Sequence, residues 1–210
     1  MITATSQHSL SILRDASQMG WHMIPLLLVV IYAYAREADE GNWPRVLAAL
    51  AFWGMDWINE IINGLVFHFS GYAPIWGIGH PSSLLILMGL NIEICFNFAL
   101  MGLAATMLIP KQRDLRILGI NNRWFCAVAN ALLCVLVELA LHSFGMLVWE
   151  WPWWNATHPL PIFLFGYLPF FVVAYWVYDM ESRKRQIAVV ATIFSIAGIA
   201  GGSFWALGWI

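Results

Sequence analysis

Six long apolar stretches are the feature that most limits how this chain can fold. A helix needs about 20 mostly apolar residues to cross a bilayer. Stretches of that kind occupy residues 20–36, 45–69, 82–109, 123–149, 159–179 and 186–209. Only 10% of the residues are charged, against roughly 25% in soluble domains. The sequence therefore predicts an all-α, polytopic integral membrane helix bundle of about six transmembrane helices, in which residues 1–210 form a single transmembrane domain.

Basic residues predict how these spans are oriented. Nine of the ten Lys and Arg residues lie in or beside the connections that follow spans one, three and five, and Arg14 is the exception. Connections rich in Lys and Arg face the cytoplasm, so both termini are expected on the non-cytoplasmic side. The expected location is the bacterial inner (cytoplasmic) membrane. With a net charge of −2 and no recognisable binding motif, nucleic acid is not an expected partner.

Three of the predicted spans carry a pair of polar residues four positions apart. These pairs are Asp56 with Glu60, Glu93 with Asn97, and Glu138 with His142. Residues four apart share one face of a helix. With a rise of 1.5 Å per residue, all three glutamates fall about 22–24 Å from the cytoplasmic end of their spans. We therefore expect Glu60, Glu93 and Glu138 to meet at one level and to line a polar chamber inside the bundle.

Amides and aromatic side chains surround the expected chamber. The residues expected to contact a bound substrate are Asn59, Asn63, Asn97, Tyr72 and Trp149. Polar side chains in membrane helices also form interhelical hydrogen bonds that hold the bundle together. For Asn63, Asn91 and Asn130 the functional and the structural interpretations are equally supported.

Several carboxylates in one membrane chamber need compensation, because a charged side chain at the bilayer centre costs about 2.5–3.5 kcal/mol on insertion scales. Either a cation balances them or at least one is protonated. A protonated carboxyl in an apolar pocket is a general acid. Such an acid, surrounded by aromatic faces that stabilise a carbocation, predicts a membrane enzyme of the cyclase, hydratase or isomerase type. Its substrate would be lipophilic, such as an isoprenoid, a steroid or a carotenoid, and its predicted catalytic residues are Asp56, Glu60, Glu93, Glu138 and His142.

Two short stretches around Glu60 add a resemblance to known enzymes. The stretch "DWINEIINGLVF" resembles the Asn/Trp/Glu signature of the small membrane-bound terpene cyclases of meroterpenoid pathways. The overlapping "NEIINGLVFHFSGY" is similar to the Glu-to-Gly-Tyr stretch of carotenoid hydratases. The resemblance covers about a dozen residues and implies that Glu60 is the proton donor. The acid–base interpretation itself requires no cofactor.

Two other functions remain open from the sequence. The first is a membrane metalloenzyme that oxidises a lipid or hydrocarbon, with Fe, Mn, Zn or Cu held by Asp56, Glu60, Glu93, Glu138 and His142. Carboxylate-rich sites of this kind need few histidines, although the chain lacks the His-box clusters of membrane desaturases. The second is a proton-coupled carrier or an accessory subunit of a membrane complex. Membrane lipids and a lipophilic small molecule are the expected partners, and the oligomeric state is left open.

Overall fold

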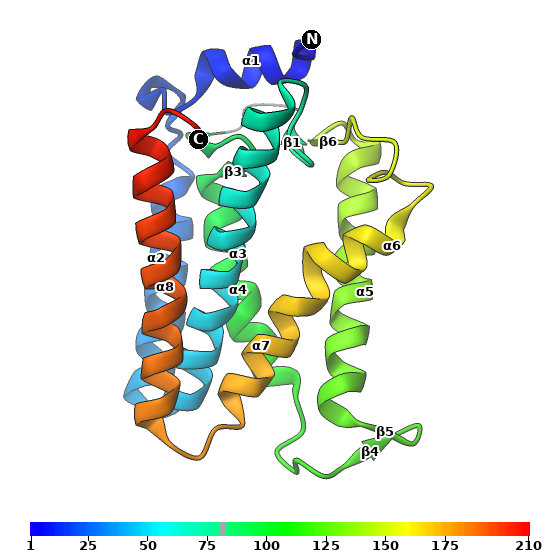
Figure 1. Ribbon diagram of the computed structural model, residues 1–210. Helices are drawn as coiled ribbons and strands as arrows, with labels where there is room; N and C mark the ends of the chain where they lie inside the picture. Colours follow the sequence, from blue (N-terminus) through cyan, green and yellow to red (C-terminus); the bar gives the residue numbers. More distant parts are fainter. Residues whose placement is uncertain (80–82) are drawn as a thin grey trace.

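A bundle of long helices forms the protein, and the computed structural model describes it for residues 1–79 and 83–210. Two short helices, α1 (Ala4–Ile12) and η1 (Ala16–Gln18), precede the bundle. The long helical segments of the described residues are α2 (Met23–Asp39), α3 (Trp43–Ser70), α4 (Ile92–Leu108), α5 (Asn122–Ser143), the continuous series α6 (Pro159–Pro161), η2 (Ile162–Tyr167) and α7 (Leu168–Tyr178), and α8 (Arg183–Ala206). Both termini lie at the same end of the bundle, and α7 crosses it obliquely from the side of α5 towards the lower end of α8 (Figure 1).

Short antiparallel ribbons join some of the helices. In the described part of the chain, β1 (Gly77–Ile78) pairs with β6 (Leu147–Val148), β2 (Leu85–Leu87) with β3 (Leu90–Asn91), and β4 (Arg116–Ile117) with β5 (Ile120–Asn121). The prediction of a helical membrane bundle is confirmed in its coarse form. The ribbons were not predicted, because strands of two or three residues leave no hydrophobic period in a sequence.

Three helical segments of the described residues are long and apolar enough to cross a membrane. They are Asn122–Ser143, Pro159–Tyr178 and Arg183–Ala206, and the apolar helix Ile92–Leu108 is shorter. The two remaining long helices, α2 and α3, coincide with predicted spans to within three residues at each end.

Two predicted spans are wrong at one end. For the predicted span 82–109, the helix begins later than expected, because α4 starts only at Ile92. The side chain of Asn91 caps the helix there by accepting a hydrogen bond from the Ile94 amide at 2.8 Å. The residues before it form the β2–β3 ribbon instead. The span 123–149 ends early, because α5 stops at Ser143 and Gly145 adopts a left-handed φ of 71°.

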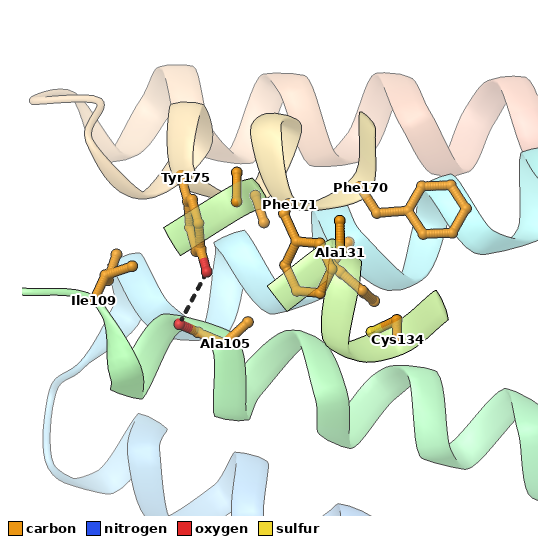
Figure 2. Packing of buried hydrophobic residues seen from close by; sticks show 10 residues of the cluster. Ala105, Ile109, Ala131, Cys134, Phe170, Phe171 and Tyr175 are labelled. Carbon is orange, nitrogen blue, oxygen red and sulfur yellow. Dashed lines mark hydrogen bonds between the residues drawn. The ribbon is translucent and has the colours of Figure 1, made fainter. Parts of the chain in front are cut away.

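Aromatic side chains of α7 fill the space between α4 and α5 (Figure 2). The ring of Phe171 packs edge-on against Phe52 of α3, with 4.9 Å between their centroids. The Tyr175 hydroxyl donates to the Ala105 carbonyl at 3.5 Å and accepts a hydrogen bond from the Asn130 amide at 2.7 Å. Asn130 therefore has a structural role, joining α5 to α7.

A glycine permits a close approach between α3 and α4. A Cβ atom on Gly102 of α4 would lie 2.9 Å from the Ala49 carbonyl oxygen and 2.9 Å from the Cβ of Phe52, both on α3. We expect Gly102→Val to lower the free energy of unfolding by about 1–3 kcal/mol, the usual cost of overpacking. Thermal unfolding of the detergent-purified protein, followed by tryptophan fluorescence, measures this effect.

The control for this variant is Gly198→Val in α8, because a Cβ atom at Gly198 meets nothing within 4 Å. Both changes carry the same helix-propensity difference, so only Gly102→Val should lower the unfolding temperature markedly. Equal losses in the two variants would contradict the close-packing explanation.

Ion pairs hold the end of the bundle opposite the termini. Arg123 of α5 donates two hydrogen bonds to Asp179, which follows α7, at 2.9 and 2.7 Å. Arg45 of α3 pairs with Glu37 of α2 at 3.1 Å. Bidentate arginine–carboxylate pairs fix geometry well, so the lower ends of α5 and α7 are held together.

Candidate functional site

The polar stripe of α3 faces the interior of the bundle. Asp56, Glu60 and Asn63 are 2%, 3% and 0% exposed, respectively. They lie at positions i, i+4 and i+7, which share one helix face. Carboxylates are rarely buried this completely without a partner or a function.

A cavity of about 100 Å³ lies against this stripe. Asp56 and Glu60 line it from α3, and Glu138 lines it from α5. Its other lining residues are aromatic, small or apolar, apart from one amide: Asn59, Trp76, Gly89, Ile94, Phe98, Leu141, Leu147, Trp154, Gly166, Tyr167 and Phe170. The structure therefore brings together two of the three glutamates expected to meet, along with Asp56.

Indole N–H groups hold one oxygen of each of these two glutamates. Trp76 Nε1 donates to Glu60 Oε1 at 2.8 Å, and Trp149 Nε1 donates to Glu138 Oε1 at 3.1 Å. By contrast, Glu60 Oε2 and Asp56 Oδ2 are buried without a hydrogen-bond partner among the described residues. Buried polar atoms are normally hydrogen-bonded, so unpartnered carboxyl oxygens beside a cavity are candidates for contact with a ligand or for carrying a proton.

A π-helical segment supplies the wall opposite α3. The segment η2 places Gly166 and Tyr167 against the cavity, and the Tyr167 hydroxyl interacts with the Glu138 carboxylate. Pro169 has no N–H to offer the carbonyl of Phe165 four residues earlier, and Asn59 Nδ2 faces that carbonyl at 3.5 Å. Single-turn π segments often occur at functional sites.

A second cavity of about 400 Å³ lies beside the first. The two cavities share Asn59, Trp76, Trp154 and Phe170 in their walls. The second cavity is also lined by Phe165, which is strongly exposed on the outside of the bundle. The carboxylate cavity is therefore separated from the outer apolar surface by a few shared side chains.

The expectation that Glu93 joins this chamber is wrong. Glu93 lies in the first turn of α4, where its Oε1 is 2.7 Å from His22 Nε2 of the segment before α2 and its Oε2 accepts a hydrogen bond from Ser83. The residues of α4 that line the cavity are Ile94 and Phe98. Each is one position after the expected residue, and one position turns the side chain by about 100° around the helix.

The same rotation explains why Asn97 is also wrong as a substrate-binding residue. Asn97 is exposed on the outside of the bundle, while its neighbour Phe98 faces the cavity. The predicted span begins at residue 82, ten residues before the helix starts. The sequence therefore predicted neither the first residue of α4 nor which of its faces points into the bundle.

Asn63 has a structural role in this arrangement. Its Oδ1 accepts hydrogen bonds from the backbone amides of Ile75 and Trp76 at 2.6 and 3.3 Å, and its Nδ2 donates to the Trp76 carbonyl at 2.9 Å. These hydrogen bonds hold the loop that carries Trp76, and the Asn63 side chain also interacts with the Glu60 carboxyl. The predicted role of Asn63 in contacting substrate is therefore not supported. The structural interpretation, left open in the sequence, explains Asn63 as a loop anchor and Asn91 as the cap of α4.

Three other predicted residues, among those the structure describes, are not part of the cavity wall. His142 Nδ1 contacts the Leu147 carbonyl at 2.9 Å, and its ring stacks on Trp149 with 4.2 Å between centroids. Trp149 in turn holds Glu138, so His142 positions a partner of the carboxylate. The Tyr72 hydroxyl donates to the Glu150 carbonyl at 3.2 Å in the outer loops.

The five residues predicted as metal ligands are not gathered in one place. Glu93 lies with His22, and His142 is engaged by Leu147, away from the Asp56 and Glu60 pair. Among residues 1–79 and 83–210, no group of three or more His, Cys, Asp or Glu side chains is arranged to hold a metal ion. The ligand set as predicted is therefore wrong.

Sequence reasoning missed two residues of the site, Trp76 and Tyr167. Trp76 lies in the loop after α3, and tryptophans near the membrane surface are commonly interfacial anchors. Tyr167 lies in a stretch, "FGYLP", whose glycine and proline could have indicated an irregular helix turn.

Comparison with known proteins gives a family but no function. A family model described as "Uncharacterized membrane protein family" matches residues 3–205. A protein of Archaeoglobus fulgidus, described as "Uncharacterized protein", is 55% identical over 199 residues, which cover 95% of this chain and 94% of that protein. Another from the same organism, with the same description, is 50% identical over 56 residues, or 25% of this chain and 95% of that protein. No solved structure matches. The chain is therefore a member of this uncharacterized membrane protein family.

Proposed function

We propose that the protein is an integral membrane enzyme that protonates a lipophilic, alkene-containing substrate of the isoprenoid, steroid or carotenoid kind. The observation that carries this proposal is the meeting of Asp56, Glu60 and Glu138 at one aromatic-lined cavity inside an apolar bundle. Intramembrane ionisable residues are costly and generally functional. The reaction would be a cyclisation, hydration or isomerisation, and none of these needs a bound cofactor.

The proposed topology has six spans, with both termini on the non-cytoplasmic side of a prokaryotic cytoplasmic membrane. Both termini lie at one end of the bundle, and the β4–β5 ribbon lies at the other (Figure 1). Lys111, Arg113, Arg116 and Arg123 lie in or beside this ribbon. The positive-inside rule places such a basic end in the cytoplasm.

Glu60 is the proposed proton donor. Its Oε1 accepts the indole N–H of Trp76, which leaves the unpartnered Oε2 to carry the proton. In the proposed step the Oε2–H bond breaks, its proton forms a C–H bond with one alkene carbon, and the other alkene carbon becomes a carbocation. Asp56, which has an unpartnered oxygen of its own, lies one helix turn away and can return a proton to Glu60.

Glu138 is the proposed base. Two donors, Trp149 and Tyr167, hold its carboxyl group in place beside the cavity. A carboxylate at that position stabilises a nearby carbocation and accepts the proton that is lost when an alkene re-forms. The faces of Phe98 and Phe170, which line the cavity, add cation–π stabilisation.

The substrate would arrive from the bilayer through the second cavity. That cavity reaches the outer apolar surface at Phe165 and shares Asn59 and Trp76 with the carboxylate cavity. A lipophilic molecule would therefore reach the acid from lipid without crossing water once these shared side chains move aside. Membrane lipids and this substrate are the proposed partners.

Incubation in D₂O tests the proposal for all three reaction types at once. The purified protein in lipid nanodiscs is given a panel of prenylated, steroid and carotenoid alkenes, and products and recovered substrates are analysed by mass spectrometry. Because each reaction begins by placing a solvent-derived proton on carbon, we expect stable deuterium incorporation in at least one substrate class. No incorporation across the panel by a correctly folded protein would contradict the proposed chemistry.

A further inference from the structure

A third cavity, separate from the carboxylate site, lies between α3 and α8. It has a volume of about 470 Å³. Trp53, Trp57 and Ile61 line it from α3, and the glycine-rich face of α8 lines it from the other side. A Cβ atom on Gly198 or Gly202 would meet nothing within 4 Å. Gly198 and Gly202 therefore leave open space, whereas Gly201 lies closer to α3, since a Cβ atom there would be 3.3 Å from Ile61 Cδ1.

One end of this groove carries a cation. Arg14 is the single charged side chain among the described residues that line it. Its backbone amide donates to the Leu85 carbonyl at 2.8 Å and its Nε donates to the Ile86 carbonyl at 3.2 Å. Its guanidinium lies 5.9 Å from the ring centroid of Trp205, which is exposed near the end of α8. The arginine is thus fixed at the mouth of the groove.

The described residues around Arg14 do not pair with its charge. Among the described residues, no ion pair involves Arg14. The adjacent carboxylate of Asp15 is engaged elsewhere, accepting hydrogen bonds from the amide and hydroxyl of Ser17 at 2.9 and 2.8 Å. The Nη groups of Arg14 remain available as donors to an anion, and arginine matches phosphate geometry well.

We propose that this groove binds an anionic phospholipid, with a hydrocarbon chain between α3 and α8 and the phosphate at Arg14. The charge and shape of the groove favour this occupant over a neutral lipid, because its inner walls are apolar and aromatic and its mouth is cationic. Arg14 is also the one Lys or Arg in the sequence that lies outside the cytoplasmic connections. The proposal does not depend on the catalytic function.

Native mass spectrometry of the detergent-purified chain tests the lipid site with phosphatidylglycerol and phosphatidylcholine as probes. A basic residue near the membrane surface contributes about 1 kcal/mol to the attraction of anionic lipid, so we expect about fivefold tighter binding of phosphatidylglycerol. Arg14→Gln should abolish that preference. Arg113→Gln, a change in the cytoplasmic connection before α5, should preserve it.

A second pair of variants tests the groove itself. Gly202→Leu should fill the open space and reduce the occupancy of both lipids, whereas Ser203→Leu adds the same side chain to α8 at an exposed position outside the groove and should not. Equal binding of the two lipids by the unaltered chain, or an unchanged preference in Arg14→Gln, would overturn the proposal. It would also be overturned if Gly202→Leu dissociated a dimer instead of displacing lipid, because a second copy of the chain would then be the occupant.

Discussion

Glu60→Gln should lower the rate of deuterium incorporation by about 100-fold or more, the usual contribution of general acid–base catalysis. Glutamine keeps the oxygen that accepts the Trp76 indole N–H and has nearly the same volume, so the loop and the cavity should stay in place. What it lacks is the proton carried on Oε2. The measurement is the initial rate of deuterium uptake in the substrate class that reacts with the unaltered protein.

Glu93→Gln is the matched control, because Glu93 is another glutamate of the bundle but faces His22 and Ser83 instead of the cavity. Its rate should remain close to that of the unaltered protein. Thermal unfolding of both variants shows whether each is folded. A folded Glu60→Gln variant that keeps its full rate would eliminate Glu60 as the acid and would transfer that role to Asp56.

Asn63→Ala should destabilise the protein by about 2–4 kcal/mol, because it leaves buried backbone groups without partners. The groups concerned are the amides of Ile75 and Trp76 and the carbonyl of Trp76. The unfolding temperature of the purified protein measures the loss. The deuterium rate should also fall, since Trp76 would no longer be held against Glu60.

Asn59→Ala provides the comparison on the same helix. Asn59 is only half-buried, and its hydrogen bond to the Phe165 carbonyl is long at 3.5 Å, so its loss should cost less than about 1 kcal/mol. Similar unfolding temperatures for the two alanine variants would show that Asn63 does not hold the loop.

Hydrophobic length alone predicted where most of the helices lie. Four of the six predicted spans coincide with helical segments to within three residues at each end. The polar spacing of α3 also placed Asp56 and Glu60 on one buried face. Both features follow from the length and the spacing of apolar and polar residues along the local sequence.

The errors came from features that depend on tertiary contacts. The apolar residues before Ile92 look like the start of a helix, but they form the β2–β3 ribbon, and Asn91 caps α4 after them. The rotation of α4 about its axis, which decides whether Glu93 or Ile94 faces inward, is set by its packing against α3. The residues that complete the site, Trp76 and Tyr167, come from a loop and a π-helical turn, whose positions follow from packing and not from any local period.

The way α5 is held has a consequence for how substrate size could be set. Asp56 and Glu60 belong to α3, which packs against α4, α7 and α8, whereas α5 reaches the bundle mainly through α7 and the π-helical segment. The Arg123–Asp179 pair anchors α5 at its lower end, far along the helix from Glu138. One wall of the cavity, on α3, is therefore fixed at the centre of the bundle. The distance from it to the wall on α5 depends on the residues of segment 162–170 that lie between them. Under the proposed function, members of the family would differ in the length of the substrate they accept through changes in this segment, while Glu60 on α3 stays the same.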